Sequence, residues 1–170
     1  DRTVERAGRA GADRVVRLDA AGRPAQLNRA ADIAEGRLLA LLHADTIVRP
    51  EWVESIAEAY DQGCRGGWFQ VEIVPERQTL AGVNALEWMA AGINGRTRLF
   101  RTATADQGIW TTRQLFDQIG GVPDLPIMEG NVFAARVRER VPISIGGPWV
   151  RISGRRWEHG GLLRTMLVMY

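Results

Sequence analysis

Cysteine and histidine are scarce in this sequence, whose 170 residues include one cysteine, Cys64, and two histidines. A single cysteine cannot form an internal disulfide or a cysteine-rich metal cluster, and its isolation favours a reducing compartment. Long apolar runs are also missing, since the run at residues 38–42 is far shorter than the roughly 20 residues of a membrane-spanning helix. With no signal peptide at its start, the chain is expected to be a soluble cytoplasmic domain.

Lysine is absent, so all 22 basic side chains are arginines, set against 20 acidic ones. The formal net charge of +2 and the scattering of the arginines along the chain argue against a nucleic-acid partner. Guanidinium groups bind diphosphates and carboxylates through paired N–H donors. A GC-rich coding bias explains the total better than a binding function does, so individual arginines, rather than their number, are the candidates for binding.

What the sequence does contain is an alternation of helical and extended patterns. Helical spacing with capping residues predicts helices, and short apolar or β-branched runs predict strands. In chain order the predicted elements are helix 3–10, strand 14–18, helix 23–34, strand 38–42, helix 51–62, strand 68–74, helix 78–91, strand 107–112, helix 114–119, helix 129–140 and one or two strands within 141–153. This alternation predicts an α/β fold, with a mostly parallel, doubly wound sheet and helices on both faces.

One domain spanning residues 1–170 is predicted, because a chain of this length buries roughly two-thirds of its unfolded surface and its composition is 45% hydrophobic. Trp68, Trp88 and Trp110 are expected in the core, since large aromatic side chains at strand or helix spacing usually pack there. The first residues resemble a helix entered part-way, and the apolar stretch 162–170 stops without a polar ending. We therefore expect a chain that is cut at both ends.

The strongest local signal lies where the apolar run 38–42 ends, at His43 and Asp45. Ligands of α/β sheets bind at the carboxyl ends of the strands. A carboxylate in that position can hold Mg²⁺ or Mn²⁺ against phosphate oxygens. Alternatively, Asp45 caps the loop before Pro50, and spacing alone does not choose between the two readings. A histidine such as His43 is more often a packed, hydrogen-bonded residue than a ligand.

Several ordered motifs point to one family. They are Gly-Arg-Pro-Ala-Gln-Leu-Asn at 22–28, Leu-His-Ala-Asp-Thr at 42–46, Asp-Gln-Gly-Ile at 106–109, Ile-Gly-Gly-Val-Pro at 119–123, Met-Glu at 128–129 and Ser-Gly-Arg-Arg-Trp-Glu at 153–158. In this order they resemble family 2 glycosyltransferases, in particular a bacterial subgroup with the Leu-His-Ala-Asp-Thr motif. The resemblance extends over nearly the whole chain.

The resemblance implies a GT-A fold, a nucleotide-sugar donor, a hydroxyl acceptor of unknown identity and inversion at the anomeric carbon. Asp45 matches the metal-binding aspartate of the family's Asp-x-Asp-type motif, with His43 at the first acidic position, and implies a Mg²⁺ or Mn²⁺ cofactor. The residues that match donor-binding positions are Arg23, Gln26, Asn28, Ala44, Asp45, Arg155, Arg156 and Trp157. The family's first strand precedes the position matching Asp1, so we expect the sheet to lack that strand.

The general base is where the sequence departs from the family. An inverting transferase needs a base for the acceptor proton, and the family usually places it on the aspartate of a Glu-Asp pair. Here the pair is Glu129-Gly130, which leaves Glu129 or Asp106 for the role. Glu129 could instead stabilise the start of the following helix. The alternative function is a catalytically silent nucleotide-sugar or carbohydrate-binding domain, and peripheral membrane association stays open.

Overall fold

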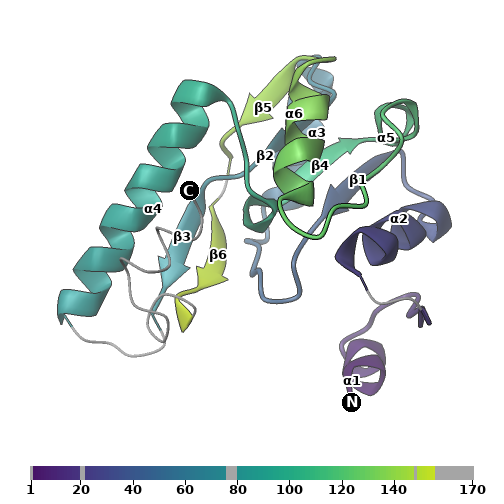
Figure 1. Ribbon diagram of the computed structural model, residues 1–170, viewed down its shortest axis with the longest axis horizontal. Helices are drawn as coiled ribbons and strands as arrows, with labels where there is room; N and C mark the ends of the chain where they lie inside the picture. The colour runs from purple at the N-terminus through teal and green to yellow at the C-terminus, as the bar shows by residue number, and fades with distance from the viewer. Residues whose placement is uncertain (1, 20–21, 76–79, 148, 156–170) are drawn as a thin grey trace.

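The computed structural model describes residues 2–19, 22–75, 80–147 and 149–155. The helices are α1 (Thr3–Arg9), α2 (Arg23–Ile33), α3 (Trp52–Asp61), α4 (Leu80–Phe100), α5 (Arg113–Gln118) and α6 (Glu129–Arg138), with a 3₁₀ turn, η1, at Ala105–Gln107. The strands are β1 (Leu38–Leu41), β2 (Gly66–Trp68), β3 (Val71–Val74), β4 (Ile109–Thr112), β5 (Ile143–Ile145) and β6 (Val150–Ser153). Figure 1 shows α4 along one side of the molecule, next to β3 and β6.

The main sheet has four strands in the order β1-β4-β2-β5. β4 runs antiparallel to β1 and β2, whereas β2 and β5 are parallel, so β1, β2 and β5 share one direction. β3 and β6 form a separate parallel pair. The predicted α/β class is confirmed, and β4 is the strand that departs from the parallel arrangement.

Helices cover both faces of the main sheet, as predicted. Along β4 the side chains alternate between two cores, since Ile109 packs with residues of α2, α5 and α6, and Trp110 packs with residues of α3 and α4. This alternation follows from the two-residue period of a strand. The sheet therefore lies between two apolar layers.

The predicted strand 68–74 is divided between the two sheets. Phe69 stands at the division, because its backbone N–H donates to the carbonyl of Gln107 and its carbonyl accepts from the Gln107 side chain, both at 3.0 Å. Those bonds take the chain out of the ladder with β4. β3 then pairs with β6 and begins a new sheet.

Two further predictions were wrong. Residues 14–18 form no strand, because a strand needs a hydrogen-bonded neighbour and no strand in the described ranges pairs with this segment. Trp88 is 79% exposed, whereas Trp68 and Trp110 are buried as expected. The buried stripe of α4 contains Leu86, Ala90, Asn94 and Thr97, and position 88 lies on the opposite side of that helix.

α4 also extends beyond its predicted end at residue 91 and continues to Phe100. Tertiary contacts hold this extension in place. The Asn94 side chain accepts from the backbone N–H of Val71 and donates to its carbonyl, both at 2.9 Å. Thr97 is fully buried and exchanges hydrogen bonds with the Gln107 side chain. Two polar anchors thus fix the second half of the helix to β3 and to η1.

Candidate active site

The chain leaving β1 brings His43 next to η1, which carries Asp106. His43 Nδ1 and Asp106 Oδ1 are 3.2 Å apart, within hydrogen-bonding distance, and the two side chains are 19% and 25% exposed. The other ring nitrogen, Nε2, is buried and has no hydrogen-bond partner among the described residues. A polar atom that is buried without a partner is costly, and this one lies in a cluster of charged groups.

The charged groups around His43 come from four different segments. Burial lowers the pKa of His43 below its ordinary value of 6.5, and the positive charge of Arg23 lowers it further. The negative charges of Asp106, Asp45 and Glu129 act in the opposite direction. With a lowered pKa, the imidazole is neutral at pH 7, and an Nδ1–H group facing Asp106 leaves Nε2 as a hydrogen-bond acceptor.

Arg23 and Glu129 form an ion pair that joins the first turns of α2 and α6. The Glu129 side chain is only 10% exposed, and that of Arg23 is 38% exposed. Met128, immediately before Glu129, is in the left-handed conformation with φ 62°. A non-glycine residue there stores backbone strain, so the local fold fixes the direction in which Glu129 leaves the loop.

Gly130 packs directly against the 3₁₀ turn that carries Asp106. A Cβ atom at Gly130 would lie 2.4 Å from the Cβ of Ala105, a separation that real Cβ atoms do not show. Gly130 is also buried. The structure therefore accounts for glycine at this position, because α6 and η1 approach each other too closely for an aspartate side chain at position 130.

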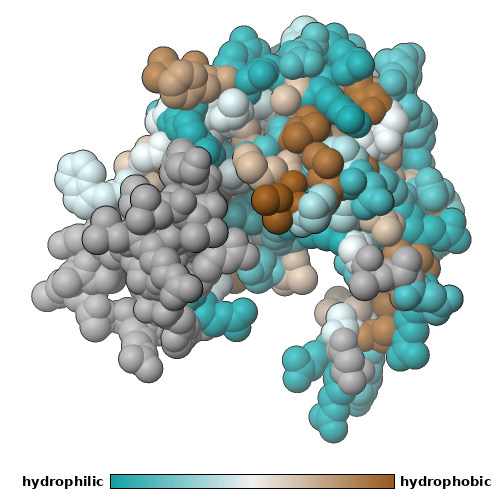
Figure 2. Space-filling view, in the orientation of Figure 1, coloured by the Kyte–Doolittle hydropathy of each residue, from teal (hydrophilic) through white to brown (hydrophobic). Residues whose placement is uncertain are grey.

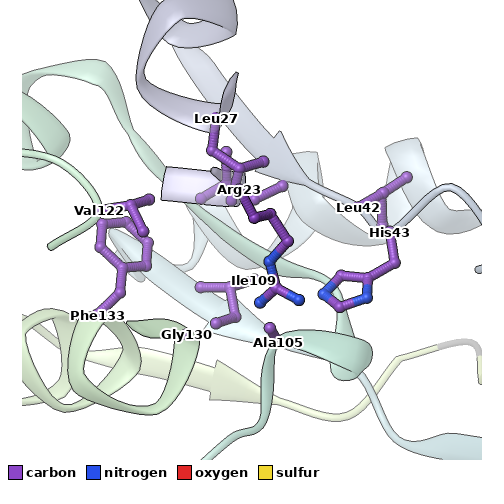
Figure 3. Close-up of a pocket in the computed structure, with 10 residues that line it drawn as sticks. Arg23, Leu27, Leu42, His43, Ala105, Ile109, Val122, Gly130 and Phe133 are labelled. Carbon is purple, nitrogen blue, oxygen red and sulfur yellow. The ribbon is translucent and has the colours of Figure 1, made fainter. Parts of the chain in front are cut away.

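A pocket lies where these segments meet. Its lining residues are Arg23, Leu27, Leu41, Leu42, His43, Ala105, Ile109, Val122, Gly130 and Phe133. Figure 3 shows the Arg23 guanidinium group and the His43 ring projecting into the same part of this pocket. The other lining side chains are apolar, so a ligand would meet a guanidinium group and an imidazole against a largely apolar wall.

Comparison with known protein families assigns the chain. The model of glycosyl transferase family 2 matches residues 1–115. The chain belongs to this family. Its mixed α/β architecture is consistent with the GT-A fold of family 2, and family membership supports glycosyltransferase activity. A comparison with curated proteins gave no match.

The matched segment of this family 2 domain contains Arg23, His43, Asp45 and Asp106, while Glu129 and Gly130 lie beyond it. Family 2 enzymes bind a nucleotide-sugar donor and an acceptor, and commonly use a divalent metal. Within the described ranges, no three His, Cys, Asp or Glu residues are grouped so that they could hold a metal ion. None of the described helices is long and apolar enough to cross a membrane.

Asp45 is exposed, two residues beyond His43, and its charge acts on the pKa of His43 together with the charges of Asp106 and Glu129. Of the three carboxylates predicted for the site, that of Asp106 contacts His43 directly, whereas those of Asp45 and Glu129 act on it through their charge. The role of Asp45 as a metal ligand stays a prediction, as do the catalytic roles of Asp106 and Glu129.

Most of the predicted donor-binding residues that the structure describes do not line the pocket. Ala44 and Gln26 are exposed, and Arg155 is exposed just beyond β6, where its backbone N–H donates to Ser153 Oγ at 3.3 Å. Arg156 and Trp157 lie outside the described residues. Of the members of this group that the structure describes, Arg23 alone lines the pocket.

Asn28, also predicted to bind the donor, has a structural task. Its side-chain amide donates to the carbonyl of Val122 at 2.9 Å and accepts from the Val122 N–H at 2.8 Å. The adjacent Gly121 has no room for a side chain, because a Cβ would lie 2.6 Å from Asn28 Oδ1. Asn28 thus holds the Gly-Gly turn, and with it the pocket residue Val122, against α2.

Gln107 is an important residue of the site that the sequence prediction missed. Its side chain is fully buried and bonds to Thr97, to the backbone N–H of Thr104 and to the carbonyl of Phe69. Thr104 and Gln107 together form a capping box around η1, and the Thr-x-x-Gln spacing could have revealed it. In the Asp-Gln-Gly motif, the glutamine fixes the turn so that Asp106 reaches His43.

Proposed function

We propose that this chain is the catalytic core of an inverting glycosyltransferase that moves a sugar from a nucleotide-diphosphate donor to a hydroxyl acceptor. The observation that carries the proposal is that Arg23 and His43, which line one pocket beyond the carboxyl end of β1, pair with the carboxylates of Glu129 and Asp106 respectively. Ligands bind at that edge of α/β sheets. The proposed chemistry needs both a cationic group for the diphosphate and a carboxylate for the acceptor.

Glu129 is the proposed general base, because Gly130 leaves no side chain at the family's usual position. The acceptor O–H proton passes to Glu129 as the acceptor oxygen bonds to the anomeric carbon. The bond between that carbon and the phosphate oxygen breaks, and its electron pair leaves with the diphosphate. A base placed in this way contributes roughly 10²–10⁴-fold to the rate.

Arg23 has two tasks in this proposal. Before the donor binds, its ion pair with Glu129 holds that carboxylate in place. When the donor binds, the guanidinium group meets the diphosphate, where negative charge develops as the bond breaks. Asp106, held by its contact with His43, is the second candidate base, and in this proposal it accepts hydrogen bonds from sugar hydroxyls.

The residues fit a divalent ion to a limited extent. Mg²⁺ commonly takes one or two carboxylates from the protein and completes its shell with phosphate oxygens and water, and the exposed Asp45 carboxylate beside His43 suits that role. Mg²⁺ or Mn²⁺ bound there would neutralise charge on the departing diphosphate. The chain's own residues perform the proton transfer and the positioning.

A catalytically silent binding domain is the second candidate. Gly130 favours it, because no carboxylate stands at the family's usual base position, and so does the pairing of Glu129 with Arg23. Such a domain would bind a nucleotide sugar in the same pocket without releasing a nucleoside diphosphate.

Donor binding and turnover, measured separately, test the proposal. A panel of nucleotide-diphosphate sugars is screened by thermal shift with Mg²⁺ or Mn²⁺, since a ligand of the folded state raises its stability. Release of nucleoside diphosphate is then followed for the donor that binds. Glu129→Gln should keep the thermal shift but lose roughly 10²-fold or more of the turnover, and Asp45→Ala should abolish turnover.

Glu139→Gln is the matched control, since Glu139 is exposed at the far end of α6, and it should behave as the unchanged protein does. A thermal shift without turnover for any donor would support the binding domain instead. If the Glu129→Gln variant turned over as fast as the unchanged protein, Asp106 would become the candidate base. The Asp106→Asn variant then tests that assignment.

A further inference from the structure

The outward face of α4 carries large apolar side chains that are mostly exposed. Trp88 is 79% exposed, Leu99 76% and Phe100 61%. Figure 2 shows apolar atoms at the upper left, over the C-terminal end of this helix, surrounded by hydrophilic surface. Exposed apolar side chains gathered on one element mark an interaction surface more often than scattered ones do.

Between Trp88 and Leu99 the same face carries two glycines, Gly92 and Gly95. A Cβ at either position would meet nothing within 4 Å, so packing within the chain does not require glycine there. Glycine also weakens a helix relative to alanine. Its presence in the middle of an exposed helix face is explained if another backbone approaches closely at that point.

The spacing of these residues is symmetrical. Trp88 and Leu99 are eleven residues apart, which is about three helical turns, and they lie on the same side of α4. Gly92 and Gly95 lie between them, each four residues from the nearer end. The order large, small, small, large therefore reads the same in both directions about a point between residues 93 and 94.

We infer that this face of α4 pairs with the same face of a second copy of the chain, with the two helices antiparallel about a two-fold axis. In a two-fold interface the same patch must be complementary to itself. With the axis between residues 93 and 94, Trp88 packs against the partner's Leu99, and Gly92 lies opposite the partner's Gly95. The glycines let the two backbones approach, and the large side chains close both ends.

The charges beside this face support the antiparallel arrangement. Glu87 and Arg98 are also eleven residues apart, on one flank of the helix, and both are exposed. In an antiparallel pair, matching flanks of the two helices face each other, so each Glu87 lies near the partner's Arg98. A parallel pair would leave the two residues about three turns apart. The two-fold axis therefore creates two equivalent contacts, each between Glu87 of one copy and Arg98 of the other.

The interface is small. Stable complexes bury about 1,200–2,000 Å² in total, and a single helix face on each copy falls at or below the lower end of that range. A reversible dimer is therefore expected, with association that depends on protein concentration. The surface does not include the residues that line the pocket, so this inference is independent of the proposed function.

Sedimentation velocity over a wide concentration range tests the inference. The mass should rise from the 18.8 kDa of one chain towards twice that value. Gly95→Gln should weaken dimerisation by roughly tenfold or more, because the larger side chain overpacks the contact. It should also preserve or raise the melting temperature of the monomer, because it improves helix propensity. A mutation that merely damaged the fold would lower it.

Gly8→Gln is the matched control. Gly8 lies in α1 and has no atoms near its Cβ position, so this change should leave the dissociation constant unaltered. The charge contact is tested by reversal: Glu87→Arg and Arg98→Glu should each weaken the dimer, and the double reversal should restore it.

Three results would overturn the inference. The first is a chain that stays monomeric at all concentrations. The second is a dimer that is insensitive to Gly95→Gln and to the charge reversals. The third is a monomer that binds anionic phospholipid vesicles and loses that binding in the Trp88→Ser and Leu99→Ser variants, which would assign the face to a membrane surface.

Discussion

Individual side chains of the site are held by partners far away in the sequence. His43 meets Asp106, and Arg23 meets Glu129, which lies on the last helix described. Asn28 and Gln107 use their side-chain amides to fix the two turns that frame the pocket. The chemistry proposed for this family 2 chain therefore depends on amide groups that do not themselves carry charge.

At the residue scale, the pKa of His43 predicts a pH dependence of stability. Because burial lowers this pKa in the folded state, the unfolded chain binds more protons as the pH falls below about 6.5. The contribution of His43 to stability is therefore present above that pH and is lost in acid. The midpoint of urea unfolding, measured without added metal, should fall from pH 7 to pH 5.5. It should fall less steeply in His43→Gln, and parallel curves would contradict the prediction.

A second residue-scale prediction concerns the close contact of Gly130 with Ala105. Gly130→Ala should lower the free energy of unfolding by about 1–3 kcal/mol, because the added methyl group overpacks the contact. Adding Ala105→Gly should recover part of this loss, as the two changes are coupled. Gly92→Ala, which has open space around it within the chain, is the control at dilutions where the protein is monomeric and should stabilise it by about 0.5–1 kcal/mol. Equal effects of the two alanines would disprove the packing argument.

At the scale of elements, helices and strands are joined by buried polar anchors as well as by apolar side chains. Asn94 links α4 to β3, and the capping box of Thr104 and Gln107 shapes η1. The long helix α4 contains two glycines in its second half, where propensity alone is weak. The buried hydrogen bonds of Asn94 and Thr97 account for the length of α4.

Asn94→Ala tests this account. It would leave a buried N–H and a buried carbonyl of Val71 without their partner, at about 1–3 kcal/mol for each unpaired group. Denaturant unfolding should show a loss of this order. Gln114→Ala, at an exposed position of α5, is the control and should stay within about 0.5 kcal/mol of the unchanged protein. A small effect of Asn94→Ala would mean that apolar packing alone holds α4.

At the scale of the whole molecule, the two apolar cores are joined through β4. Its residues Ile109 and Trp110 are 2% exposed on opposite faces of the sheet. A central strand that contributes to both cores makes it difficult for one layer to unfold while the other persists. The molecule is therefore expected to unfold as one unit, although the two strands β3 and β6 form a separate sheet.

Unfolding followed by two methods tests this cooperativity. Far-ultraviolet circular dichroism and tryptophan fluorescence should give coincident transitions, which is the usual criterion for two-state behaviour. Ile109→Ala should lower stability by about 2–5 kcal/mol and move both transitions together. Separate midpoints for the two signals would show that the layers on the two faces of the sheet unfold independently.

Much of the fold followed from local sequence patterns. The apolar run of β1 and the helices at α2 and α3 were recognised because each depends on neighbours within a few residues. Residues 14–18 were predicted wrongly because β-branched residues form a strand only beside a partner strand. Trp88 was misplaced because its exposure depends on which face of α4 meets β3.

The sequence by itself determined the alternation of helices and strands, the position of Asp45 just after the strand β1, and the ordered motifs that mark family 2. These features rest on periodicity and composition, which act over a few residues. Only the tertiary structure decided that Glu129 pairs with Arg23, that His43 pairs with Asp106, and that Ala105 excludes a side chain at Gly130. Such contacts join segments tens of residues apart, and their geometry exists only once both cores have packed.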